Sequence, residues 1–180
     1  MKVVALVGMA GSGKSEVSRE FEDCGYQRIR FGDVTDEEIT RRGLDLNEAN
    51  ERWIRELLRK DHGEAVYAKL SMPKIDNYLK SSSVIVDGLY SWEEYQMLRE
   101  KYADNLVLVS VHSSPDTRYA RLAKRPIRPL TRQETVGRDA AEIENINKGG
   151  PIAMADYVII NESSFDDLKS LTQKIIAVFE

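Results

Sequence analysis

The chain has 180 residues, enough for a single domain (residues 1–180) with a hydrophobic core, and its formal net charge at pH 7 is −4. This balance gives no global basic field that would favour nucleic acid or a membrane surface, so a polyanionic ligand would need a local cluster of Lys and Arg. The single cysteine excludes an internal disulfide, and no apolar run approaches the ~20 residues of a membrane span. We therefore expect a soluble, cytoplasmic protein without membrane or nucleic-acid partners.

The chain begins with a strand, a loop and a helix in direct succession. Residues 2–7 are apolar on both faces, as a buried parallel strand requires, and residues 16–21 have a helical pattern. Between them lies Gly8-Met9-Ala10-Gly11-Ser12-Gly13-Lys14-Ser15, a complete G-x-x-x-x-G-K-S phosphate-binding loop. Strand, loop and helix together form the context in which this motif is reliable.

Each part of the loop suits a nucleotide phosphate. Glycines let the backbone curl so that several N–H groups point at one anion, and the helix start adds partial positive charge. The ammonium of Lys14 would reach the outer phosphates, and the hydroxyl of Ser15 would ligate Mg²⁺. The alternative is a glycine-rich turn that binds nothing. We assign phosphate binding to Gly8, Gly11, Ser12, Gly13, Lys14, Ser15 and Glu16.

A second strand is predicted at residues 27–31, and a long helical insertion follows it. Thr35 begins a capping-box pattern that predicts the first helix of this insertion. Further helical patterns cover residues 47–60 and 64–79. We expect the whole insertion, at about residues 34–80, to form a flap over one edge of the sheet and to bind the acceptor of a reaction.

The second half of the chain continues the alternation of strands and helices. Ser91, Ser114, Thr131 and Ser164 are predicted to begin helices, and Leu171 belongs to the expected apolar face of the last one. Buried strands are predicted at residues 83–88, 106–111 and 157–160. Five apolar strands that alternate with helices predict a parallel α/β sheet covered on both faces, with the ligand at the carboxyl ends of the strands.

Two acidic residues fall at these strand ends. Asp87 ends a Val-Ile-Val strand, where a carboxylate could hold phosphate-bound Mg²⁺ directly or through water; alternatively, it caps the turn at Gly88. Asp33 follows the second strand and could orient or deprotonate an acceptor group. A helix N-cap explains Asp33 equally well.

Arginines are concentrated after the fourth strand. Arg118, Arg121 and Arg125 are three and four residues apart, so we predict that they share one helical face. In phosphoryl transfer, arginines of a mobile segment stabilise the charge that spreads over the transferred group. We therefore predict a lid at about residues 118–150, with Arg121 and Arg125 as its catalytic arginines. A solvated basic face is the alternative.

The helical flap offers a candidate acceptor-binding residue, Arg59, which could grip an acceptor phosphate with two hydrogen bonds or could simply be a surface arginine. The hypothesis that combines these features is a small-molecule kinase. Two alternatives remain: an ATPase or nucleotide-dependent switch that acts on a macromolecular partner, and a binding module with little turnover.

Several short motifs resemble a known family. The Gly8–Ser15 loop, Gly32-Asp33-Val34 and Asp87-Gly88 resemble nucleoside-monophosphate kinases, adenylate kinase in particular. Arg121-Leu122 with Arg125 and the run 155–161 resemble dephospho-coenzyme A kinase. The archaeal adenylate-kinase-related group is similar to both, and Arg138-Asp139 and the run 152–157 resemble its pattern.

The resemblance implies a three-layer P-loop fold whose five-stranded parallel sheet has the order 2-3-1-4-5. It also implies MgATP as the donor, with Ser15 and Asp87 at the metal and Asn161 beside the adenine. AMP is the favoured acceptor and dephospho-coenzyme A the alternative. Leu89-Tyr90-Ser91 stands where adenylate kinase carries an acceptor arginine, so the acceptor site departs from a standard AMP site. We place the acceptor contacts at Asp33, Arg59, Gly88 and Arg138.

Overall fold

The computed structural model describes residues 1–179. Five parallel strands form one sheet in the order β2-β3-β1-β4-β5, which confirms the expected topology. The strands are β1 (Val3–Val7), β2 (Gln27–Arg30), β3 (Val84–Asp87), β4 (Leu106–His112) and β5 (Tyr157–Ile160). The three central strands are buried along nearly their whole length, as strands covered by helices on both faces must be.

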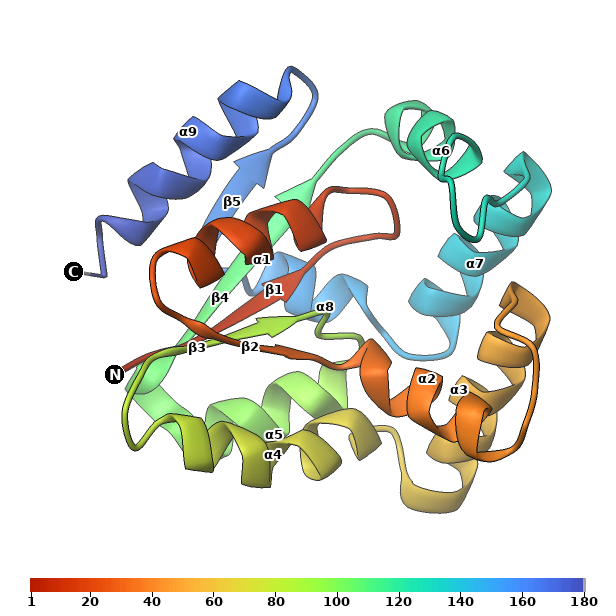
Figure 1. The fold of residues 1–180 in the computed structure, drawn as a ribbon, viewed down its shortest axis with the longest axis horizontal. Coiled ribbons are helices and arrows are strands. Elements are labelled where there is room, and N and C mark those ends of the chain that lie inside the picture. The colour runs from red at the N-terminus through yellow and green to blue at the C-terminus, as the bar shows by residue number, and fades with distance from the viewer. Residues whose placement is uncertain (180) are drawn as a thin grey trace.

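Helices cover both faces of the sheet and make a three-layer α/β fold (Figure 1). On one face lie α1 (Lys14–Asp23) and α9 (Phe165–Ile176); on the other lie α4 (Val66–Tyr78) and α5 (Trp92–Tyr102). The alternating side chains of β1 separate the core into two clusters, because Val4 and Leu6 pack toward α1 and α9 whereas Val3 and Ala5 pack toward α4 and α5.

Four further helices lie beyond the carboxyl ends of the strands, namely α2 (Gly32–Arg41), α3 (Glu48–His62), α6 (Pro115–Ala123) and α7 (Arg132–Glu144). The short α8 (Gly149–Ala153) packs beside α5, where Ile152 joins the core cluster on that face. A single 3₁₀ turn, η1 (Ala103–Asn105), connects α5 to β4. Within residues 1–179, none of the helices is long and apolar enough to cross a membrane.

Most predicted helix starts are confirmed by their caps. Ser91, Thr131 and Ser164 each accept a hydrogen bond from the backbone N–H three residues on, and the acidic residue at that position returns the bond. Asn47 caps α3 with its side chain alone, because its Oδ1 accepts from the N–H of Asn50 and no bond is returned. These caps depend on residues close in the chain, so the sequence alone is sufficient to locate them.

Three local predictions are wrong. Helix α2 begins at Gly32, directly after β2, so Thr35 lies inside it and its hydroxyl is 2.7 Å from the hydroxyl of Tyr67. Helix α6 ends at Ala123, so Arg125 does not share a helical face with the preceding arginines. On α9 the inward face holds Leu168 and Ile176, whereas Leu171 is exposed, because α9 covers an edge of the sheet with a narrow apolar stripe.

Candidate functional site

The loop between β1 and α1 has the shape that a phosphate requires. Gly8 has φ = 142°, and a Cβ atom there would lie 2.2 Å from the carbonyl oxygen of Val111. Gly13 has φ = 102°, and its Cβ would lie 2.3 Å from Nδ2 of Asn161. Any residue other than glycine would push the loop away from β4 and β5 at these two points. The glycines therefore hold the loop tightly against the carboxyl ends of the strands.

Lys14 lies folded over this loop. Its Nζ donates to the carbonyl oxygens of Gly8 at 2.7 Å and Met9 at 3.0 Å. Burial, with the nearby Lys148 ammonium as the next cause, lowers the pKa of Lys14 to about 7. The hydroxyl of Ser12 is also buried and has no hydrogen-bond partner among the described residues. Both groups would gain a partner from an anion held in the loop.

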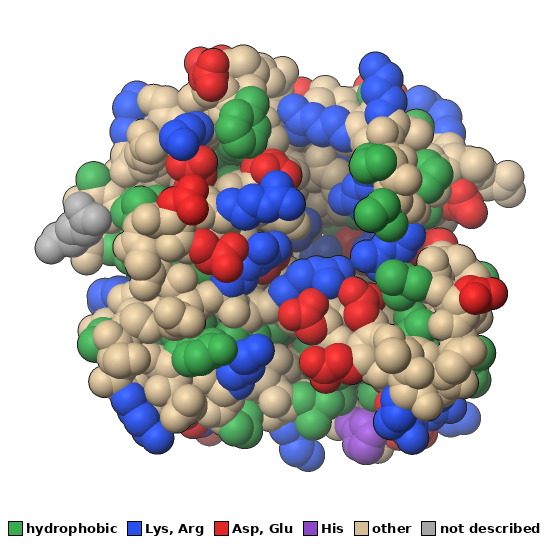
Figure 2. Space-filling model, viewed as in Figure 1, with side chains coloured by type: hydrophobic (Ala, Val, Ile, Leu, Met, Phe, Trp, Pro, Cys, Tyr) green, Lys and Arg blue, Asp and Glu red, His purple; other side chains and the backbone are tan. Residues whose placement is uncertain are grey.

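The loop borders a cavity of about 350 Å³, which we call the donor cavity. It is more basic than the chain as a whole, since seven Lys or Arg and five Asp or Glu side chains line it. Figure 2 shows Lys and Arg gathered around the central hollow of the molecule, with Asp and Glu at its rim. The lining cations are Lys14, Arg30, Arg121, Arg125, Arg128, Arg138 and Lys148. This is the local cationic cluster that a polyanion needs in an acidic protein.

Ser15 and Asp87 both line the donor cavity, and both supply hard oxygen ligands of the kind that Mg²⁺ prefers. Asp87 reaches this position because β3 pairs with β1 in a register that sets it beside Leu6, just before the loop. No group of three or more His, Cys, Asp or Glu within residues 1–179 could hold a metal ion without other ligands. The residues therefore fit a magnesium ion that takes most of its ligands from nucleotide phosphates and water.

Asp87 has a partner that its local sequence does not predict. Arg28, two residues before the position on β2 that pairs with Asp87, forms an ion pair with its Oδ2. The strand register places both side chains on the same face of the sheet. Because β2 was expected to contribute only Asp33 to the site, no local pattern pointed to this long-range pair.

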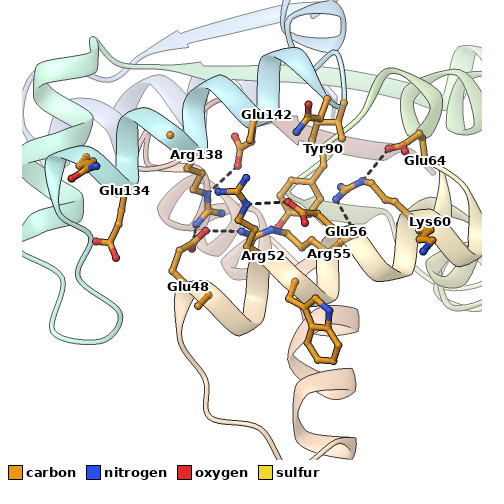
Figure 3. A pocket seen from close by; sticks show the side chains of 18 residues that line it. Glu48, Arg52, Arg55, Glu56, Lys60, Glu64, Tyr90, Glu134, Arg138 and Glu142 are labelled. Carbon is orange, nitrogen blue, oxygen red and sulfur yellow. Dashed lines mark hydrogen bonds and ion pairs between the residues drawn. The ribbon is translucent and has the colours of Figure 1, made fainter.

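A larger cavity, of about 820 Å³, lies between α3 and α7, and we call it the acceptor cavity (Figure 3). Trp53, Ala49 and Ala141 give it apolar walls, and arginines from both helices line it as well. It shares four lining residues with the donor cavity: Glu48, Tyr90, Arg138 and Glu142. The two cavities therefore adjoin at this group of residues.

Arg138 lies at the junction of the two cavities. Its Nη1 donates to Glu48 on α3 at 3.2 Å, and its Nε donates to Glu142 on α7 at 3.1 Å. Figure 3 shows this arginine between the two helices with both carboxylates turned toward it. A guanidinium at this place can contact an anion in either cavity.

Arg59 lines only the acceptor cavity. Its side chain is 9% exposed, and its Nε and Nη2 have no hydrogen-bond partner among the described residues. Its nearest anion is Glu64, at 3.4 Å from Nε, and its guanidinium lies 4.9 Å from the centre of the Tyr67 ring. Buried guanidinium donors without partners are costly, which favours an anionic ligand at this position.

The predicted lid arginines have different environments. Arg118 is buried, forms two hydrogen bonds to Asp139 at 3.0 and 2.6 Å, and lines neither cavity, so it joins α6 to α7. Arg121 lines the donor cavity and donates to Ser113 Oγ at 2.9 Å. Arg125 also lines the donor cavity, and no hydrogen bond or ion pair of its guanidinium is found within residues 1–179, although its backbone N–H donates to the carbonyl oxygen of Leu122.

Of the other predicted site residues, some line a cavity and some do not. Gly88 lines the donor cavity, whereas Asp33 lines neither cavity and instead forms an ion pair with Arg30 at 2.8 Å. Asn161 is buried beside the loop, where its Nδ2 donates to the carbonyl oxygen of Ser12 at 2.8 Å. Its expected contact with adenine stays a prediction, since the side-chain hydrogen bonds of Asn161 join it to the loop and to Arg121.

Tyr90, Glu142 and Lys148 were not anticipated from the sequence. Lys148 follows a helix and precedes two glycines, a pattern typical of an exposed turn, yet it is 1% exposed. The one available signal was the spacing of Arg138 and Glu142, which are one helical turn apart and therefore face the same side.

Fold and site together define a P-loop, kinase-like domain, and comparisons with known proteins agree. Residues 4–145 match the family model described as AAA domain. The UPF0200 protein TK1334 of Thermococcus kodakarensis is 35% identical over 97% of this chain and 96% of its own length. The UPF0200 protein PF1294 of Pyrococcus furiosus is 36% identical over 98% and 96% of the two chains. The chain therefore belongs to the UPF0200 family, whose name says nothing about a substrate.

Solved structures share the fold at low sequence identity. TT1252 from Thermus thermophilus has a TM-score of 0.65 at 20% identity and covers 99% of this chain and 98% of its own. A shikimate kinase from Bacteroides thetaiotaomicron has a TM-score of 0.63 at 15% identity, with the same coverage. A gluconokinase from Sinorhizobium meliloti scores 0.54 at 16% identity, again with 99% and 98% coverage. These likenesses establish a kinase-like fold.

Proposed function

We propose that this protein transfers the γ-phosphoryl group of ATP to a small anionic acceptor, with AMP or a related nucleotide as the favoured acceptor. The observation that carries the proposal is the junction of two cavities at Arg138. One cavity has the G-x-x-x-x-G-K-S loop, and the other has the buried Arg59, of which two guanidinium nitrogens have no hydrogen bond among the described residues and only Glu64 as an ion-pair partner. Such a pair of sites suits a reaction that moves a charged group from one bound molecule to another.

The donor half of the mechanism follows from the loop. Backbone N–H groups around Gly11 and Gly13 would hold the phosphates, and Lys14 would exchange its two carbonyl partners for their oxygens. Magnesium, held by Ser15 and the nucleotide with Asp87 nearby, would neutralise the β and γ oxygens. Arg121 and Arg125, which also line the donor cavity, would stabilise the negative charge that develops on the transferred group.

The acceptor half depends on α3 and α7. Arg59 would fix the anionic group of the acceptor, and the apolar wall at Trp53 would cover its uncharged part. Closure of α6 and α7 over the phosphates would exclude water, because water at the junction would hydrolyse ATP without transfer. Arg138 would then contact the phosphoryl group as this group moves from the donor cavity to the acceptor cavity.

A second class of acceptor is favoured by a specific observation. No arginine directly follows Gly88, where Leu89-Tyr90-Ser91 stands, and the guanidinium of Arg59, whose Nε and Nη2 have no hydrogen bond, could bind a carboxylate as well as a phosphate. The fold neighbours titled shikimate kinase and gluconokinase suggest by their names that this scaffold serves small hydroxy acids. The hydroxyl of such an acid, or of dephospho-coenzyme A, could therefore replace the AMP phosphate as the attacking group.

The test is ADP formation from MgATP, measured by a coupled assay with AMP, other nucleoside monophosphates, dephospho-coenzyme A, shikimate and gluconate, each against a control without acceptor. We expect one acceptor class to raise the rate well above that control. If the rate with every acceptor equals the rate of the control without acceptor, the transfer proposal is overturned. Stimulation only by a protein partner would instead favour an ATPase or switch.

A further inference from the structure

A second lysine lies at the donor cavity beside Lys14. Lys148 stands between α7 and α8 and is 1% exposed. Its Nζ donates to Glu142 Oε2 at 2.7 Å and lies 5.1 Å from the centre of the Tyr90 ring. The cavity that Lys14 lines is also lined by Lys148, although neither the phosphate-loop motif nor the lid arginines include it.

The pair between Lys148 and Glu142 is an expensive way to stabilise a fold. Removing an ammonium and a carboxylate from water costs as much as their attraction returns, and packed apolar side chains would serve a core equally well. Glu142 also holds Arg138 through its other oxygen, so one carboxylate keeps two cations at the cavity. In the free protein, Glu142 thus pairs with both cations, so their positive charges are kept at the cavity beside the phosphate loop without being unpaired.

The backbone fixes Lys148 to the body of the domain. The N–H of Trp92, at the start of α5, donates to the carbonyl oxygen of Ile146 at 3.2 Å. Asn147 takes the left-handed φ of 51°, and a Cβ atom on Gly150 would lie 2.6 Å from the Trp92 ring. Because α5 follows directly from β3 and its turn, Lys148 is held relative to the strand that carries Asp87. The backbone also joins Lys148 to α7, since its N–H donates to the carbonyl oxygen of Glu142 at 3.1 Å.

We propose that Lys148 is a second phosphate-binding lysine. When a nucleoside triphosphate fills the donor cavity, the ammonium of Lys148 breaks its bond with Glu142 and binds an oxygen of the terminal phosphate instead. This inference rests on the proposed function. The terminal phosphate is the group concerned because Glu142 links Lys148 to Arg138, at the junction where the transferred phosphoryl must pass. Lys148 exchanges no proton in this step: an anionic oxygen of the acceptor forms a bond to the γ phosphorus, the bond from the γ phosphorus to the bridging oxygen breaks, and ADP leaves with the electron pair of that bond.

The electrostatics of the free protein agree with this role. The ammonium of Lys148 is the largest charge effect that lowers the pKa of Lys14, after burial itself. Two ammonium groups close enough to disfavour each other are stabilised when an anion lies between them. Glu142 partly offsets the repulsion in the free protein, and a phosphate would replace it in the loaded one.

The experiment compares the binding of two nucleotides by calorimetry. Wild-type protein, Lys148→Met and Lys174→Met are titrated with MgADP and with a non-hydrolysable ATP analogue that has a β,γ-imido bridge. Lys174 lies on α9, is exposed and lines neither cavity, so its variant is the matched control. We expect Lys148→Met to bind the triphosphate analogue about 10- to 100-fold more weakly, the range of one charge-assisted hydrogen bond. Its affinity for MgADP should change by less than about 3-fold on the same reasoning.

A second variant separates direct contact from damage to the fold. Lys148→Met leaves Glu142 with an unpaired buried oxygen, whereas the double variant Lys148→Met/Glu142→Gln removes that charge too. If Lys148 touches the phosphate, the double variant still lacks the preference for triphosphate over diphosphate. Recovery of the wild-type preference in the double variant would overturn the inference, and so would an unchanged preference in Lys148→Met.

The same titrations distinguish this inference from the proposed function. A wild-type protein that binds neither nucleotide would overturn both the donor site and the role of Lys148. A wild-type protein that binds both, with the preference for triphosphate intact in Lys148→Met, would overturn only the role of Lys148.

Discussion

The donor and acceptor cavities are built in different ways. The donor cavity depends on eight consecutive residues whose glycines bend the backbone and whose N–H groups and lysine face inward. The acceptor cavity depends on side chains from α3 and α7, such as Glu48 and Arg138, that lie 90 positions apart in the chain. Backbone geometry therefore determines the first site, and ion pairs between distant helices determine the second.

This difference has a functional consequence. A backbone site accepts any ligand with the right phosphate chain, because N–H groups do not vary with sequence. A site made of side chains can change its ligand with a few substitutions while the fold is kept. The donor is therefore expected to be common to proteins with this loop, whereas the acceptor must be found for this chain by experiment.

The largest effect is expected from Lys14→Met. This variant keeps the length of the side chain but removes the ammonium from the loop, so MgATP affinity should fall by at least about 100-fold. Calorimetry measures the change, with Lys174→Met on α9 as a control lysine far from the loop in sequence and absent from both cavities. Equal affinity in Lys14→Met and wild type would show that the loop is not the phosphate site.

The next largest effect is expected at the acceptor cavity. Arg59→Met should raise the KM for the acceptor about 10- to 100-fold and leave the Kd for MgATP unchanged, because Arg59 lines only that cavity. Arg59→Lys should restore little, since an ammonium cannot form two parallel hydrogen bonds. The control is Arg41→Met on α2, an exposed arginine that lines neither cavity. A parallel loss of MgATP affinity in Arg59→Met would mean that the two cavities are not separate sites.

The pH dependence of nucleotide binding sharpens the comparison further. Burial and Lys148 lower the pKa of Lys14 to about 7, with Arg138 in the same direction and with Glu142 and Asp87 opposing. Above pH 7 the free protein increasingly holds a neutral Lys14, which must take up a proton to bind phosphate. MgATP affinity should therefore fall with rising pH, by up to about 10-fold per pH unit.

Calorimetry from pH 6 to 9, in buffers that differ in ionisation enthalpy, measures both the affinity and the proton uptake. Lys14→Met is the reference, and it should show neither this slope nor this uptake. A wild-type affinity that is level between pH 7 and 9, with no proton uptake, would contradict the lowered pKa of Lys14.

The smallest effect is expected at Glu94, a buried acid that holds the backbone of Tyr90, and Tyr90 lines both cavities. Glu94 is fully buried and accepts N–H bonds from Tyr90 and Ser91, and burial raises its pKa to about 7. An acid whose folded pKa is raised is protonated in both states at low pH, and the protein then loses stability as pH rises from about 4.5 to about 7. Glu94→Gln keeps the acceptor oxygen and removes the charge, so it should be more stable than wild type at pH 8 by about 1–3 kcal/mol.

Urea unfolding at pH 5 to 8 measures this effect. The matched control is Glu134→Gln, because Glu134 holds the same place in the exposed capping box of α7. Its hydrogen bonds with Thr131 lower its pKa, so its contribution to stability is present above the unfolded pKa and is lost as pH falls. Stabilisation by both substitutions at pH 8 would mean that burial is not the cause at Glu94.

The sequence by itself determined the features that depend on neighbouring residues. The phosphate loop, the capped starts of α3, α5, α7 and α9, and the apolar strands all follow from local patterns, which have the same physical meaning in any fold. Family resemblance added the strand order, which the structure confirms. The start of α2 was mislocated because Thr35 forms its hydrogen bond with Tyr67, a residue 32 positions away.

Only the tertiary structure decided which charged side chains meet. Arginines of one spacing pattern have different places in the fold. Arg118 is a buried connection because α7 sets the Asp139 carboxylate beside it, whereas Arg121 lines a cavity and binds the Ser113 hydroxyl and the Asn161 amide oxygen at the strand ends. Lys148 looks like a surface residue in the sequence and is buried because the turn after α7 packs on α5. The energy of an ion pair depends on burial and distance, and a one-dimensional pattern contains neither quantity.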